Sequence, residues 1–180
     1  MNDSLGRTYL ESAIKRLLTY KDLGDKTFAQ LSDADFHFQP NAVSNSLAVI
    51  VQHLGGNMLS RWTGFLAEDG EKPWRDRDGE FEDRALSKAG ILDIWEKGWS
   101  CMLDSLRSLQ PDDLLKTVSI RGESLSAVDA INRQLAHIPH HVGQIIYLGK
   151  IIRGQEWKNL SIPKGKSKDF NSQMTSLNKG

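Results

Sequence analysis

The sequence predicts an all-α fold in which four long helices form a four-helix bundle with long inter-helix connections. Four stretches place apolar residues three or four positions apart with charged residues between them, the pattern of helices with one buried face. Two of the connections are long, polar and rich in glycine, proline or charge, as inter-helix loops often are. The chain of 180 residues is long enough to bury one sizeable core, and it has no internal repeat of fixed period.

The first two helices are predicted over residues 4–30 and 47–66, where leucine, isoleucine and aromatic residues share one helix face. Pro40 interrupts the segment between them, because proline cannot continue a helix. Asn45 or Ser46 is expected to cap the second helix, since both side chains accept hydrogen bonds from the free N–H groups of a helix start.

A charge-rich segment at residues 67–84 follows the second helix and is predicted to be a solvated loop, too polar to pack as an element. The third helix is expected over about residues 88–109, with Ser87 as its cap and Pro111 closing it. After it, residues 117–121 alternate between apolar and polar. This run is either a short extended segment or has no regular structure.

The fourth helix is predicted to start at Ser126, which has the capping-box spacing to Asp129, and to reach residues 153–154. Residues 1–156 are therefore expected to form one helical domain. Residues 157–180 are small, polar and basic, and we expect a poorly ordered tail.

Composition limits the classes of function. The 23 Lys and Arg balance the 23 Asp and Glu, so no strongly basic field points to nucleic acid or to an anionic membrane as a partner. We find no signal-peptide core and no apolar run long enough to span a bilayer, and we expect a cytoplasmic protein. A single cysteine, Cys101, excludes an internal disulfide framework and is expected to be a small core residue.

The most informative stretch is "QLAHIPHHVGQIIYLGKII", residues 134–152, which holds three histidines. His137 and His141 are four apart, so on a helix they project from one face and can converge on one ion. His140 is rotated away from both and is not expected to be a ligand. The alternative is that all three are partly exposed residues beside the core, and Pro139 should kink or loosen the helix in either case.

The histidine pair lies on the shoulder of the apolar stripe of the fourth helix, with Gln144 one turn further on. The second helix has a similar arrangement, because His53 flanks its stripe with Asn57 and Arg61 on the same side. Imidazoles in the middle of a core would be hard to satisfy, whereas imidazoles on two shoulders can meet in a cleft between helices. Gln144 and Asn57 are candidates to orient the rings.

Three stretches of the sequence resemble one known family. The second predicted helix contains "SLAVIVQHLGGNMLSRW", and the last contains "HIPHHVGQI". Together they resemble the DinB superfamily of YfiT-like metalloenzymes, and "DGEKPWRDRDGEFE" points to its branch labelled domain of unknown function 1572. The resemblance covers roughly residues 5–155, and HxxxHxGQ is its most specific element. It implies a four-helix bundle of DinB-like type and a divalent metal held by His53, His137 and His141.

The resemblance also implies an activity. Superfamily members with known reactions are similar to transferases and isomerases that use low-molecular-weight thiols, and others are hydrolase-like. We therefore expect a divalent-metal-dependent enzyme whose three-histidine site activates a thiol or water, such as a transferase that joins a low-molecular-weight thiol to a small-molecule electrophile. Zinc or nickel suits three imidazoles best. The alternative is a non-catalytic metal-binding or interaction protein, a homodimer whose site is structural or vestigial. No HExxH pattern is present, which disfavours a zincin-type protease.

Two further features have simpler explanations. His37, in the loop before the second helix, is expected to be structural. The charged segment 67–84 is expected to be solvated, although four of its residues would otherwise line the mouth of the cleft or a dimer contact: Arg75, Arg77, Asp78 and Glu82.

Overall fold

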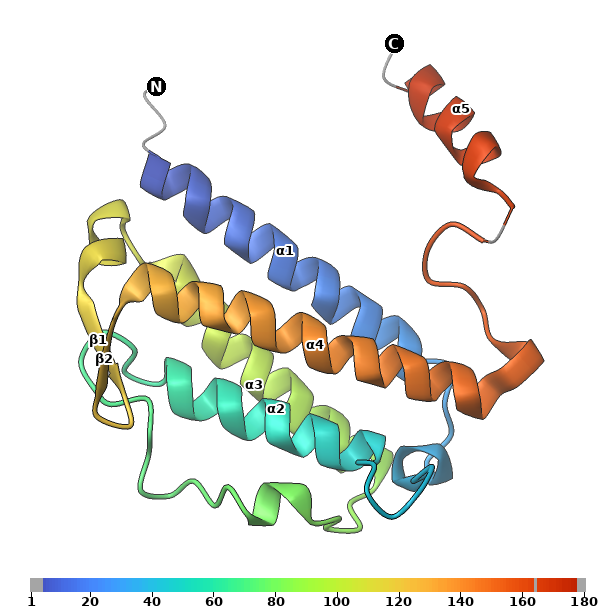
Figure 1. Ribbon diagram of the computed structural model, residues 1–180, viewed down its shortest axis with the longest axis horizontal. Coiled ribbons are helices and arrows are strands. Elements are labelled where there is room, and N and C mark those ends of the chain that lie inside the picture. The colour runs from blue at the N-terminus through green and yellow to red at the C-terminus, as the bar shows by residue number, and fades with distance from the viewer. Residues whose placement is uncertain (1–4, 164, 178–180) are drawn as a thin grey trace.

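The computed structural model describes residues 5–163 and 165–177, and most of them are helical (Figure 1). The longer helices are α1 (Leu5–Phe28), α2 (Leu47–Trp62), α3 (Lys88–Ser108), α4 (Ala127–Arg153) and α5 (Ser167–Leu177). Four short 3₁₀ turns are η1 (Ala34–His37), η2 (Gly79–Phe81), η3 (Pro111–Leu115) and η4 (Gly154–Glu156). The antiparallel strands are β1 (Thr117–Ile120) and β2 (Glu123–Ser126). The prediction of a mostly helical chain is confirmed.

The core lies between two helix pairs, α2 with α3 and α1 with α4, which lie side by side in Figure 1. Its fully buried side chains come from all four of these helices and include Leu17, Leu54, Met58, Ile91, Trp95, Trp99, Met102 and Ile131. Helices α2 and α3 approach closely at two glycines, because a Cβ atom on Gly98 would lie 3.1 Å from the Cα of Gly55. The packing fixes α2 and α4, the two helices that carry the candidate site.

Three serines begin the helices as predicted. Ser46 accepts a hydrogen bond from the N–H of residue 49 at the start of α2, and Ser87 and Ser126 do the same for α3 and α4, each over 3.3 Å. Helix α4 stays helical through Pro139. The expected positions of these helix starts are confirmed.

Helix α2 ends at Trp62, four residues before the predicted end at residue 66. Thr63 is extended and Gly64 takes a positive φ of 61°, which turns the chain away from the helix axis. Phe65 still stacks on Trp62, with ring centroids 4.5 Å apart, so the apolar periodicity continues beyond the helix. Residue 4, the predicted start of the first helix, lies outside the described residues.

In the run at residues 117–121, the first four residues form strand β1 of a hairpin that lies at one end of α2 and α4 (Figure 1). Its two turn residues, Arg121 and Gly122, have φ angles of 57° and 73°. The carboxylate of Asp69 accepts hydrogen bonds from both turn N–H groups at 2.8 Å and from the hydroxyl of Ser119 at 2.5 Å. These bonds, that of Ser119 foremost, hold the pKa of Asp69 well below its usual value.

The tail predicted at residues 157–180 contains α5, which stands apart from the packed helices (Figure 1). Residues 164 and 178–180 of this segment lie outside the described residues. Within the described part of the chain, no helix combines the length and the apolar character that crossing a bilayer requires.

Candidate metal centre

Three histidines from two helices meet at one point between α2 and α4. One ring nitrogen each from His53, His137 and His141 lies within 4.8 Å of the others. The Nε2 atom of His137 is 3.2 Å from the Nε2 of His53 and 3.2 Å from the Nε2 of His141. His140 is exposed and is not part of this group. The structure therefore brings together the three residues that the resemblance selects and leaves the neighbouring histidine outside.

The two separations from His137 fit nitrogens that share a single ion. Imidazole nitrogens bind zinc at about 2.0–2.1 Å, so two ligands at octahedral to tetrahedral angles are about 2.9–3.4 Å apart. Both recorded Nε2–Nε2 separations fall in this range.

Hydrogen bonds on the far side of two rings aim their lone pairs at the centre. The Nδ1 of His53 lies 3.2 Å from a carboxylate oxygen of Glu80, and a carboxylate only accepts, so this nitrogen carries the proton. The Nδ1 of His141 lies 2.8 Å from the side-chain oxygen of Gln144, the contact expected from their spacing. Each ring thus keeps the lone pair of its Nε2 for the centre. Asn57 makes no such contact, and its Oδ1 is buried without a partner in the described part of the chain.

His137 lies between His53 and His141 and cannot donate a hydrogen bond to both of them. Burial, with help from His141 and His53, lowers its pKa to about 3, so the ring is neutral at physiological pH. A neutral imidazole has one N–H, which can serve only one of the two Nε2 contacts. Its Nδ1 is buried and has no hydrogen-bond partner within residues 5–163 and 165–177. A cation shared by three lone pairs resolves this conflict, so the residues fit a metal ion.

Glu80, which sequence reasoning missed, comes from η2 in the charged segment. Its side chain is 6% exposed and its oxygens accept hydrogen bonds from Arg75 at 2.7 and 2.8 Å. Burial raises the pKa of Glu80, but the bonds from Arg75 and His53 outweigh burial and hold it below its usual value. Gly56 makes room for it, because a Cβ there would lie 2.1 Å from the carboxylate.

The expectation that residues 67–84 are only a solvated loop is therefore wrong at its centre. Arg75 and Glu80 are buried because each neutralises the other, and Arg75 also donates to the hydroxyl of Ser60 at 2.9 Å. The minority interpretation, in which the segment reaches the cleft, holds for Arg77, which lines the adjacent pocket.

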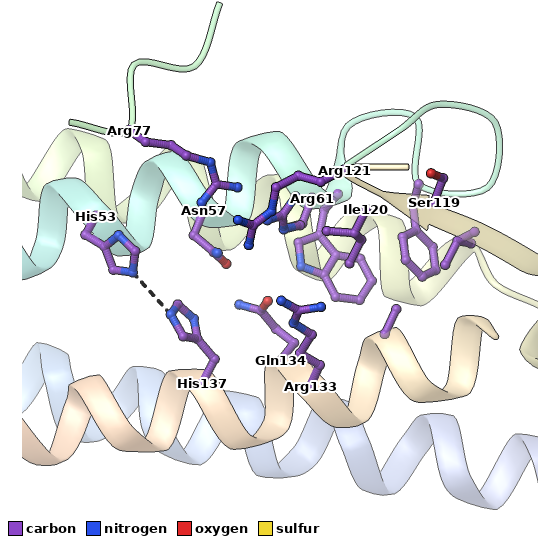
Figure 2. A pocket seen from close by; sticks show the side chains of 14 residues that line it. His53, Asn57, Arg61, Arg77, Ser119, Ile120, Arg121, Arg133, Gln134 and His137 are labelled. Carbon is purple, nitrogen blue, oxygen red and sulfur yellow. Dashed lines mark hydrogen bonds between the residues drawn. The ribbon is translucent and has the colours of Figure 1, made fainter. Parts of the chain in front are cut away.

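A pocket of about 250 Å³ opens beside the histidines (Figure 2). It is lined by His53, Asn57, Arg61, Trp62, Phe65, Arg77, Val118, Ser119, Ile120, Arg121, Ala130, Arg133, Gln134 and His137. The residues include four arginines and no aspartate or glutamate. In Figure 2 the arginine side chains lie between the histidine end and Ile120 of the hairpin.

Cys101 and His37, the two other residues considered in the sequence analysis, lie outside this pocket. Cys101 is partly buried against the core, with its sulfur 3.5 Å from the hydroxyl of Thr63, as expected for a small packing residue. His37 contacts Asp83 at 2.7 Å and the carbonyl of Leu86 at 2.9 Å, which ties η1 to the segment before α3. Its predicted structural role is confirmed.

A comparison with models of known protein families identifies the family of this chain. A family model described as "Protein of unknown function (DUF1572)" matches residues 4–166, which is most of the chain and extends past residue 156. No curated protein matches the sequence.

Proposed function

We propose that this chain, which belongs to the DUF1572 family, is a divalent-metal-dependent enzyme that activates a low-molecular-weight thiol or water at His53, His137 and His141. The observation that carries the proposal is the convergence of three Nε2 atoms, two of them oriented by outer hydrogen bonds. As part of this proposal we place the family among the DinB-like four-helix bundles, on the basis of the paired helices and the HxxxH element on α4.

Zinc or nickel is the metal that we propose, because both suit a set of imidazole ligands. A divalent ion held only by neutral imidazoles keeps its full charge, and it acidifies a thiol or water bound beside them. Glu80 and Gln144 fix the rings of His53 and His141 by their outer hydrogen bonds, and burial keeps His137 unprotonated.

The surroundings of the site favour a thiol over water as the nucleophile. No carboxylate lines the pocket, and Glu80 is already bound to Arg75 and His53, so the described residues offer no free carboxylate there as a general base. A free thiol has a pKa of about 8.5 against about 15.7 for water, so it needs far less help to ionise. Because Cys101 lies elsewhere, the thiol has to come from a cosubstrate, and a small electrophile is the proposed second substrate.

The first test is metal content. Untagged protein reconstituted with zinc or nickel should hold about one ion per chain, and replacing any of the three site histidines with alanine should lower this sharply. The matched control is His140→Ala, since His140 is adjacent, exposed and outside the group, and it should bind normally. Metal content below about a tenth of an ion per chain would contradict the proposal.

The second test is activity. The metal-loaded protein should conjugate a chloro-dinitroarene to at least one of bacillithiol, glutathione and coenzyme A, and His137→Ala should abolish turnover. The measurement is made on protein with full metal content. If its turnover with each of the three thiols is no higher than that of the His137→Ala variant, the result would favour the non-catalytic alternative. The proposed homodimer is tested separately, by the mass in solution.

A further inference from the structure

We propose that the pocket beside the three histidines binds a small organic oxyanion, a carboxylate or a phosphate, through Arg61, Arg121 and Arg133. The apolar part of the ligand would lie against the stacked rings of Trp62 and Phe65. The inference names a chemical class for a substrate of the proposed enzyme and rests on the proposed function for that role. The binding itself requires only the side chains of the pocket.

The charge of the pocket is the first argument. Four arginines line it, from α2, the segment after α2, the hairpin turn and α4. Figure 2 shows Arg61, Arg77 and Arg121 on the α2 side of the pocket and Arg133 on the α4 side. The lining contains no carboxylate. Because the whole chain has a formal charge of zero, this cluster does not follow from a basic composition. Guanidinium groups recognise carboxylate and phosphate oxygens by paired hydrogen bonds.

Nearby acids neutralise this charge only in part. Glu71 pairs closely with Arg77, with one contact at 2.9 Å, but its distance to Arg61 is 3.7 Å. Arg133 is 3.7 Å from an exposed Glu123. Arg121 forms no ion pair among residues 5–163 and 165–177. At least one positive charge therefore faces the pocket without a close counterion.

The guanidinium of Arg61 is a buried positive charge in this cluster of arginines. It is only 8% exposed and its guanidinium donates to the carbonyl of Gly70. Burial first, and then the charges of Arg75, Arg77 and Arg121, lower the pKa of Arg61 to about 10. Glu71 raises the pKa of Arg61 only in part, because it lies 3.7 Å away and pairs more closely with Arg77. Arg61 remains charged at physiological pH, and a buried charge with only a distant counterion is unfavourable. An anion in the pocket would supply that counterion.

Unpartnered polar groups in the lining are a second, independent observation. The indole N–H of Trp62 and the side-chain nitrogen of Gln134 have no hydrogen-bond partner among the residues that the structure describes, and these two residues are 3% and 5% exposed. Buried donors normally have partners, so their position in one pocket indicates a polar ligand. The volume of about 250 Å³ limits the ligand to a small molecule.

Arg121 is held in place in spite of its backbone conformation. Its φ of 57° is unfavourable for a residue with a side chain, and asparagine before glycine is the preferred pair in such turns. Asp69 nevertheless fixes this turn through the N–H groups of Arg121 and Gly122. Because the turn itself does not favour arginine, we assign the side chain of Arg121 a role in the charge of the pocket.

The test is calorimetric titration of metal-free, full-length protein with benzoate, phenyl phosphate and the neutral analogue benzamide. At least one of the two anions should bind about tenfold or more tightly than benzamide, and the stronger one identifies carboxylate or phosphate as the preferred group. Raising the salt concentration should weaken the anions and leave benzamide unchanged. Equal binding of all three probes, or binding of none, would overturn the proposal.

Arg121→Asn is the decisive variant, because asparagine suits the turn and the fold should be kept. Anion affinity should fall about tenfold or more while the melting temperature is kept or raised. The matched control is Arg107→Asn, an exposed arginine on α3 outside the pocket, which should bind normally. Unchanged affinity in Arg121→Asn contradicts the inference. Metal content is measured on the same preparations, so anion binding and metal binding can each fail without the other.

Discussion

Replacing Glu80 with glutamine tests whether an outer hydrogen bond orients the metal site. Glutamine keeps the size of the side chain but removes the charge that fixes the proton on Nδ1 of His53. Losing such an outer partner typically weakens metal binding about 10–100-fold, or about 1.4–2.7 kcal/mol. The same change leaves Arg75 buried beside a neutral group, so the metal-free protein should lose about 1–3 kcal/mol of stability.

These values translate into measurable melting temperatures. At a free metal concentration of about 100 times the wild-type dissociation constant, binding stabilises the wild type by about 2.7 kcal/mol. Affinity lowered 10–100-fold leaves only about 0.4–1.4 kcal/mol at that concentration. For a chain of this size 1 kcal/mol corresponds to about 2–4 °C, so the metal-induced shift falls from about 5–11 °C to about 1–6 °C.

The assay is differential scanning calorimetry with and without metal, combined with a competition titration for affinity. The matched control is Glu71→Gln, because Glu71 also pairs with an arginine but does not contact the three histidines. This control should keep the wild-type shift. The reasoning is refuted if Glu80→Gln also keeps it, since the hydrogen bond to His53 would then have no influence on the metal.

Two further predictions follow from named contacts. Gly56→Ala should lower metal affinity as Glu80→Gln does and destabilise the protein by about 1–3 kcal/mol, because the new methyl group overlaps the carboxylate of Glu80. Its matched control, Gly143→Ala, has open space and should stabilise α4 by up to about 1 kcal/mol in chemical denaturation; a loss of stability there would contradict the steric argument. The contact with Asp83 raises the pKa of His37, so the stability from this pair is complete below the unfolded pKa and is lost as pH rises through the folded pKa. Asp83→Asn should therefore cost more stability at about pH 5.5 than at about pH 9 in urea denaturation, and an equal cost at both would refute the assignment.

The helices and the histidine pair were predictable because their signals are local. Apolar periodicity located the helices, and serine caps located three helix starts, since both depend on residues within one or two turns. The spacing of His137 and His141 fixes their relation on any helix, and so does the spacing to Gln144. The end of α2 was less predictable, because Phe65 continues the apolar pattern after the helix has stopped at Trp62.

The sequence does not reveal which residues of the charged segment 67–84 are buried, because their burial depends on contacts with residues elsewhere in the chain. A run of alternating charges is usually solvated, and nothing local distinguishes Glu80 from the other acids of this segment. Glu80 is buried because a glycine on α2 leaves space for it and because Arg75 supplies a matching charge. Gly56, one turn after His53, was the only local sign of a close approach. The contribution of the hairpin to the pocket was missed for the same reason, since Asp69 and Arg121 are far apart in sequence.

The candidate metal centre and the candidate anion pocket share one face of α2. His53, Asn57 and Arg61 repeat every four residues on α2, so they form one stripe along a wall of the pocket. At about 1.5 Å per residue, the Cα of Arg61 lies about 12 Å along the axis from that of His53. The neutral imidazoles leave the charge of an ion undiminished, and Glu80, neutralised by Arg75, does not offset it. The proposed thiolate at one end and the proposed oxyanion at the other would thus be favoured by the same excess of positive charge.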